Sequence, residues 1–113
     1  MEKLGTANFP GALGAEYEFV AFPLEWEPDS IGAVYAFTGR DPSTSPATHE
    51  ILYVGVAEDI NERLSGHEKL KCVMPLGCNC ICIHPENSEQ ARLHKEKDLI
   101  AKHNPPCNRQ VIS

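Results

Sequence analysis

The pattern of apolar positions along the chain predicts three strands. Residues 33–38 and 50–55 are apolar, β-prone runs separated by a loop rich in Gly, Pro and Ser. Two such runs joined by a loop are typical of an antiparallel pair. Residues 78–84 form a third apolar run, which Pro85 ends.

Apolar residues at helical spacing predict two helices, one over residues 58–66 and one over residues 88–103. The first helix carries on one face Ile60, Arg63, Leu64 and His67. For the second helix, Asn87 followed by Gln90 resembles a capping box. Its apolar stripe consists of Leu93, Leu99 and Ile100, and Glu96 lies within that stripe. A carboxylate there is costly unless it reaches solvent, pairs with a lysine or binds a cation.

The order β-β-α-β-α predicts a small α/β (α+β) domain whose three-stranded, mainly antiparallel sheet is flanked by helices. We assign this domain to residues 31–113. Residues 1–30 are acidic and rich in Gly and Pro, so we expect an N-terminal extension packed on the domain. The sequence has neither an apolar run of membrane-spanning length nor a secretory signal, which places the protein in the cytoplasm with no membrane partner.

Five cysteines are present, and the odd number in a cytoplasmic setting predicts reduced thiols. Three of them alternate along the third strand and are expected on one side of it: Cys78, Cys80 and Cys82. With Cys72, Cys107 or His84 they offer a zinc site, although a straight strand spreads its ligands more than the usual zinc spacing does. Small buried side chains under a helix are the simpler interpretation.

The net charge of −6 opposes strong binding to a polyanion, but the charge is unevenly distributed. Residues 1–62 contain two basic residues and 11 carboxylates, whereas residues 63–113 contain eight basic residues and five carboxylates. A basic surface on the C-terminal half is therefore compatible with the sequence, while a strongly basic domain is excluded.

Short motifs in the order Tyr, Tyr-x-Gly, Arg and Glu span residues 31–109. They are Ala33-Val34-Tyr35, Tyr53-Val54-Gly55, Arg63 with His67 following, Glu96, and Pro105 with Asn108. In this order and phase they resemble the GIY-YIG nuclease superfamily. That superfamily includes homing endonucleases, the incision nuclease of bacterial excision repair and some restriction enzymes.

The resemblance implies a metal-dependent endonuclease that hydrolyses phosphodiester bonds in nucleic acid, with DNA as the expected partner. It implies that Glu96 holds one divalent cation, Mg²⁺ or Mn²⁺, because hard cations prefer oxygen ligands. Arg63 would contact the scissile phosphate through its planar guanidinium.

The remaining motif residues would have supporting roles. One of Tyr35 and Tyr53 would act as the general base, and His67 would relay a proton or position the phosphate. Gly55 and Asn108 would hold the geometry of the site. Two alternatives remain open from the sequence: a catalytically inactive module of the same fold that binds nucleic acid or protein, and a zinc-stabilised interaction domain.

Overall fold

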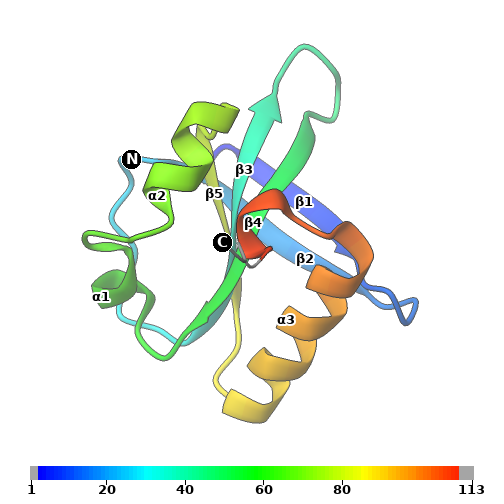
Figure 1. The fold of residues 1–113 in the computed structure, drawn as a ribbon, viewed down its shortest axis with the longest axis vertical. Coiled ribbons are helices and arrows are strands. Elements are labelled where there is room, and N and C mark those ends of the chain that lie inside the picture. Colours follow the sequence, from blue (N-terminus) through cyan, green and yellow to red (C-terminus); the bar gives the residue numbers. More distant parts are fainter. Residues whose placement is uncertain (1–2, 110–113) are drawn as a thin grey trace.

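A five-stranded antiparallel sheet forms the centre of the molecule in the computed structural model, which describes residues 3–109 (Figure 1). The strands are β1 (Gly5–Pro10), β2 (Glu16–Pro23), β3 (Ala33–Asp41), β4 (Thr48–Ala57) and β5 (Cys80–Pro85). Their order across the sheet is β1-β2-β5-β3-β4, and every neighbouring pair is antiparallel. The last three strands lie where the sequence predicted strands.

The prediction of a three-stranded sheet is wrong, because the N-terminal segment adds two strands to it. The second half of β2 pairs with β5, from Val20 opposite Ile83 to Pro23 opposite Cys80. The buried side chains of Tyr17, Phe19 and Ala21 alternate with exposed or half-exposed ones in β2. This period of two is the strand pattern, so residues 5–23 belong to the sheet itself.

Side chains of β3 alternate between two apolar cores, one on each face of the sheet. Val34 and Ala36 join the core beneath α3 (Glu89–His103). Tyr35 and Phe37 join the opposite core, which α1 (Ile60–Leu64) and α2 (Leu70–Val73) cover. Two short 3₁₀ helices, η1 (Met74–Leu76) and η2 (Pro106–Asn108), follow α2 and α3.

The helices begin at side-chain caps that differ slightly from those the sequence predicted. Asp59 caps α1 by accepting a hydrogen bond from the backbone of Glu62. Ser88, and not Asn87, caps α3 by accepting from the backbone N–H of Ala91 at 3.2 Å. In both cases the side-chain oxygen satisfies a backbone donor that the first turn leaves free.

The apolar stripe predicted for α3 is only partly correct. Leu99 is buried, but Leu93 is 43% exposed, and the helix instead buries the charged residues Arg92 and Asp98. Asp98 accepts hydrogen bonds from the hydroxyl of Tyr17 at 2.6 Å and from a backbone amide of the β1–β2 turn. A buried carboxylate is stable when it is bonded in this way, and its partner lies in the N-terminal segment.

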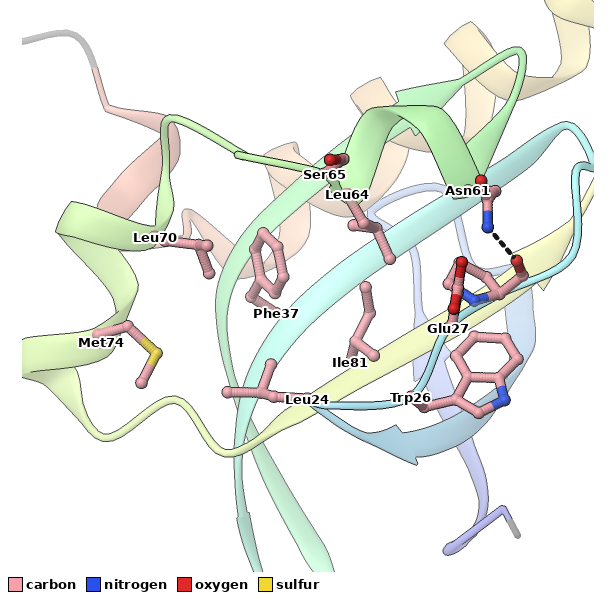
Figure 2. Close-up of a pocket in the computed structure, with 11 residues that line it drawn as sticks. Leu24, Trp26, Glu27, Phe37, Asn61, Leu64, Ser65, Leu70, Met74 and Ile81 are labelled. Carbon is pink, nitrogen blue, oxygen red and sulfur yellow. Dashed lines mark hydrogen bonds between the residues drawn. The ribbon is translucent and has the colours of Figure 1, made fainter. Parts of the chain in front are cut away.

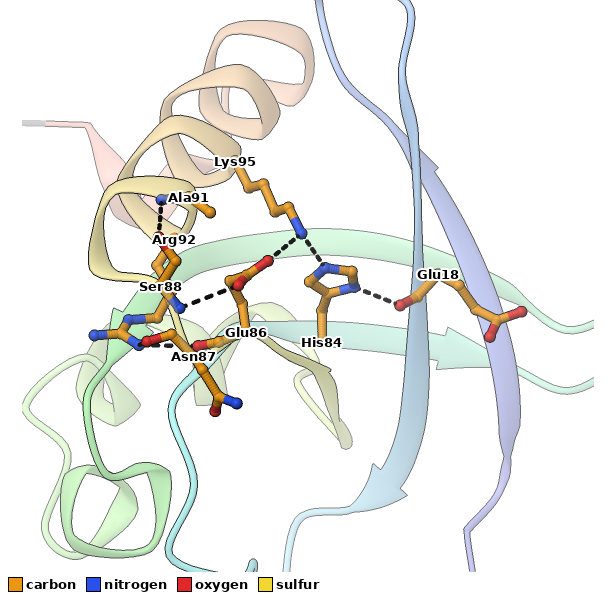
Figure 3. A network of polar contacts seen from close by, with 8 residues as sticks. All are labelled: Glu18, His84, Glu86, Asn87, Ser88, Ala91, Arg92 and Lys95. Atoms are coloured by element: carbon orange, nitrogen blue, oxygen red, sulfur yellow. Dashed lines mark hydrogen bonds and ion pairs between the residues drawn. The ribbon is translucent and has the colours of Figure 1, made fainter.

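A polar network joins the start of α3 to β5 and β2 (Figure 3). Lys95 bonds both to Glu86, at 2.7 Å, and to Nε2 of His84, at 2.8 Å. An ammonium group only donates, so Nε2 accepts and Nδ1–H donates to the carbonyl of Glu18 at 2.8 Å. The network also includes Arg92, whose guanidinium donates to the backbone carbonyl of Glu86.

The prediction that all cysteines are reduced is wrong, because Cys72 and Cys107 form a disulfide. The bond joins the end of α2 to η2 across 35 residues of sequence. Cys78 precedes β5 and belongs to the core on the Tyr35 face, whereas Cys80 and Cys82 point into the other core. The three strand cysteines therefore do not share one side.

No helix among residues 3–109 is long and apolar enough to cross a membrane.

Candidate active site

Tyr35 and Tyr53 lie on neighbouring strands of the same sheet face. In the β3–β4 ladder Tyr35 is opposite Gly55 and Phe37 is opposite Tyr53. The two tyrosine rings have centroids 6.1 Å apart. Gly55 is required between them, because a Cβ there would lie 2.7 Å from the Tyr35 hydroxyl and 2.8 Å from the Tyr53 ring. The missing side chain is what allows both rings to occupy this face.

His67 lies directly behind Tyr35, with its Nε2 2.5 Å from the tyrosine hydroxyl oxygen. Its Nδ1 accepts a hydrogen bond from the backbone N–H of Lys69 at 3.0 Å, so Nδ1 carries no proton. Burial, followed by the nearby positive charge of Arg63, lowers the pKa of His67 to about 4. The ring is therefore neutral at pH 7, its proton is on Nε2, and it donates to the oxygen of Tyr35.

The two tyrosine hydroxyls differ in their surroundings. Tyr35 is fully buried, and burial raises the pKa of its hydroxyl strongly. Burial also raises the pKa of Tyr53, which remains partly exposed, while the charge of Arg63 acts to lower that pKa. Tyr53 is consequently the hydroxyl that water or a ligand can reach, and Tyr35 is a protonated group behind it.

Arg63 forms a bidentate ion pair with Glu68. The guanidinium donates from both terminal nitrogens to the two carboxylate oxygens, at 2.7 and 3.0 Å. This pairing raises the pKa of Arg63 and lowers the pKa of Glu68 to about 2. Glu68 is exposed, so the pair is a surface salt bridge, which solvent and salt screen. The oxygens of a phosphate can accept hydrogen bonds from the same two guanidinium nitrogens, so a phosphate can displace the carboxylate of Glu68.

Glu96 comes from the middle of α3, and its carboxylate is half-buried. Burial raises its pKa, and its charge in turn acts to raise the pKa of Tyr53. Within residues 3–109, no hydrogen bond or ion pair engages this carboxylate. The charge of Glu96 thus acts on Tyr53, but Glu96 forms no hydrogen bond or ion pair with Tyr35, Arg63 or His67.

Asn108 fixes the strand that carries Tyr53 and Gly55. Its side-chain oxygen accepts from the N–H of Val54 at 2.8 Å, and its side-chain nitrogen donates to the carbonyl of Val54 at 2.8 Å. β4 is an edge strand, so these backbone groups face outward from the sheet. The amide therefore takes the place that a sixth strand would occupy.

Two cavities adjoin this group of residues. One, of about 720 Å³, has Arg63 on its wall together with the acidic side chains of Glu58, Asp59 and Glu62; neither tyrosine lines it. The other, of about 560 Å³, is mainly apolar and is shown in Figure 2. Phe37 lies on its wall, and the ring of Phe37 also contacts His67 at a centroid distance of 5.0 Å.

The sequence analysis identified four residues that the structure brings together, namely Tyr35, Tyr53, Arg63 and His67. It missed Glu68, although an acidic residue five positions after the arginine was a visible signal for a partner. It also missed the N-terminal segment as part of the apolar cavity, which Leu24 and Trp26 line. Comparisons with protein-family models, with curated proteins and with solved structures found no match for this chain.

Proposed function

We propose that the protein is a metal-dependent endonuclease that hydrolyses phosphodiester bonds, with DNA as the expected substrate. The observation that carries this proposal is the arrangement of Tyr35 and Tyr53 within the field of one arginine, with a neutral histidine donating to the buried tyrosine. A fully buried hydroxyl needs a partner such as His67 in any fold, but packing does not require the charge of Arg63 beside both hydroxyls. The resemblance of the motif residues to the GIY-YIG superfamily supports the same assignment.

In this proposal Arg63 binds the scissile phosphate after the phosphate displaces Glu68. Guanidinium matches phosphate oxygens in geometry and stays charged at working pH, so it can stabilise charge that develops on the phosphate in the transition state. The weak, exposed ion pair with Glu68 keeps the guanidinium oriented until substrate arrives.

Tyr53 would then face the attacking water, because it is the more accessible hydroxyl. Its pKa lies above its ordinary value in the free protein, so Tyr53 would first have to release its own proton to bulk water, helped by a further positive charge, before its oxygen could accept the proton of the attacking water. Tyr35 accepts a hydrogen bond from His67 Nε2, which leaves its own proton to be donated towards Tyr53. The pair Tyr35–His67 would hold the Tyr53 oxygen in place and stabilise negative charge on it.

Glu96 fits a site for one divalent cation. Its carboxylate is half-buried, has a raised pKa and has no partner among the described residues, and a cation would compensate for that burial. A bound Mg²⁺ or Mn²⁺ would neutralise phosphate charge and acidify a water molecule. With one protein carboxylate, water and phosphate oxygens would complete the shell, as Mg²⁺ prefers.

One observation favours the alternative of a catalytically inactive interaction module. The cavity beside Arg63 is lined by three acidic side chains, and the whole chain carries a net charge of −6. Such a surface repels a polyanion unless cations screen it. The test must therefore cover both low and moderate ionic strength, with Mg²⁺ and with Mn²⁺.

Cleavage of supercoiled plasmid and of labelled duplex, branched and single-stranded oligonucleotides tests the proposal. We expect metal-dependent nicking by the wild type, loss of it in Glu96→Gln, and a fall of about 10²–10³-fold in Arg63→Ala. Glu89→Gln, an exposed glutamate on the same helix, is the matched control and should retain full activity. A wild type that is inert on all these substrates supports the interaction module, and parental activity in Glu96→Gln overturns the metal role of Glu96.

A further inference from the structure

A second group of potential metal ligands lies on the sheet face opposite Tyr35. Cys80 and Cys82 point to the same side of β5, and both are fully buried. Their sulfur atoms are 4.0 Å apart. His49 reaches them from β4, with Nδ1 3.8 Å from the sulfur of Cys82. The three ligand atoms lie within 4.8 Å of one another, and no other such group of three occurs among residues 3–109.

These separations are close to those that a tetrahedral ion imposes. Zinc–sulfur bonds of about 2.3 Å at a tetrahedral angle place two sulfurs about 3.8 Å apart, and a sulfur and an imidazole nitrogen about 3.6 Å apart. The observed values are 4.0 Å for Cys80–Cys82 and 3.8 Å for Cys82–His49. The third pair, Cys80 and His49, is at most 4.8 Å apart, so one ion would draw these two ligand atoms together by up to about 1.2 Å and the other two pairs by a few tenths of an ångström.

The sheet topology explains how residues from separate strands meet here. β5 and β4 are the two neighbours of β3, and they flank it on opposite sides. The side chain of His49 crosses over Thr38 of β3, to which its Nδ1 is hydrogen-bonded at 2.8 Å. An ion at this place would join β4 to β5 across the intervening strand. It would also replace the bond to Thr38, whose hydroxyl lies 3.9 Å from the sulfur of Cys82 and can donate to it instead.

The donor set selects the class of ion. Two thiolates and an imidazole are soft and borderline ligands, which suit Zn²⁺ and Cu⁺ and do not suit Mg²⁺ or Ca²⁺. With two thiolates and a neutral histidine, Zn²⁺ gives a site of zero net charge, whereas Cu⁺ leaves one uncompensated negative charge. Because the two sulfurs are fully buried, the neutral combination is the cheaper one to desolvate.

We infer that His49, Cys80 and Cys82 bind one Zn²⁺ ion, with a water molecule as the fourth ligand. Water can approach the site past His49, which is half-exposed and lines a cavity of about 1000 Å³ next to β1 and η2. The remaining cysteines cannot take part. Cys72 and Cys107 are bonded to each other, and Cys78 lies in the core on the other face.

The first experiment measures zinc content and coordination. Protein purified without a reductant, so that the Cys72–Cys107 disulfide stays intact, should contain about one zinc per chain by mass spectrometry of the metal. After exchange for Co²⁺ it should show thiolate-to-cobalt absorption in the near ultraviolet and tetrahedral d–d bands in the visible. Cys82→Ser and His49→Gln should lose both signals. Cys78→Ser is the matched control, because it removes an equally buried thiol outside the group, and it should retain them.

The second experiment does not depend on a folded cysteine variant. At free zinc about 100-fold above its Kd, the Tm of the wild type should rise by about 10 °C, and this rise should vanish in His49→Gln. Three results would overturn the inference: no zinc bound after dialysis against micromolar Zn²⁺, equal loss of zinc in Cys78→Ser, or a Cys80–Cys82 disulfide in the mass spectrum of the protein purified without a reductant. Tighter retention of Cu⁺ than of Zn²⁺ in competition would overturn the choice of metal.

Discussion

Replacing Asn108 by alanine should destabilise the protein far more than the loss of one polar side chain normally does. The Asn108 amide satisfies both backbone groups of Val54, each at 2.8 Å, and Val54 is fully buried. Alanine would leave one N–H and one carbonyl, both in a part-buried setting, without partners. A fully buried unpaired group costs about 1–3 kcal/mol and a part-buried one less, so Asn108→Ala should lower the free energy of unfolding by about 2–4 kcal/mol.

The chain contains a matched control for this substitution. Asn79 makes the same two-bonded contact with the backbone of Arg40, at 2.7 and 3.0 Å, but its contact is exposed to solvent. Water can replace an exposed partner, so Asn79→Ala should cost less than about 1 kcal/mol. Urea denaturation followed by circular dichroism compares the two variants. An Asn108→Ala variant no less stable than Asn79→Ala would show that the amide does not secure the edge of β4.

Three further predictions concern the residues around the tyrosines. Glu68→Gln should free Arg63 and raise the affinity for a labelled oligonucleotide several-fold in fluorescence anisotropy, while stability changes by less than about 1 kcal/mol; unchanged affinity would argue against phosphate binding by this arginine. Gly55→Ala places a Cβ 2.7 Å from Tyr35 and should cost about 1–3 kcal/mol in urea denaturation, so parental stability would contradict the described packing. Because the folded-state pKa of His67 is about 4 and its unfolded value about 6.5, stability should fall as pH drops from 6.5 towards 4, by about 2 kcal/mol at pH 5; the same fall in His67→Asn would assign it to other groups.

Three of the five strands could be predicted from the sequence because each is an apolar run bounded by turn residues or proline. β2 was not predicted because glutamates occupy its exposed positions and make the segment look polar, although Tyr17 and Phe19 alternate with them. Its pairing partner, β5, is also remote in sequence, so no local signal marks the contact. The same holds for the Cys72–Cys107 disulfide, because the approach of two thiols is a property of the folded chain.

The residues of the candidate site could be predicted from the sequence, but the hydrogen bonds and the ion pair between them could not. The residues themselves came from a resemblance of motifs, since neither Tyr35 nor Arg63 is unusual at its position. The link between Tyr35 and His67 depends on where the chain turns after α1, which the helical spacing did not define. Charge alone did not reveal that Glu68 would take both donors of Arg63, because exposed carboxylates are common on such surfaces.

The position of β5 between β2 and β3 also affects how the chain must fold during synthesis. The His84–Glu18 contact between β5 and β2 spans 66 residues of sequence, and such non-local pairings form slowly. A ribosome delivers the β1–β2 hairpin first, and that hairpin has no strand to bind until residues 80–85 emerge. Until then the free edge of β2 is a template for pairing with other chains. Aggregation during translation is therefore the main hazard that this strand order creates, even though the finished sheet pairs residues 20–23 of that edge with β5.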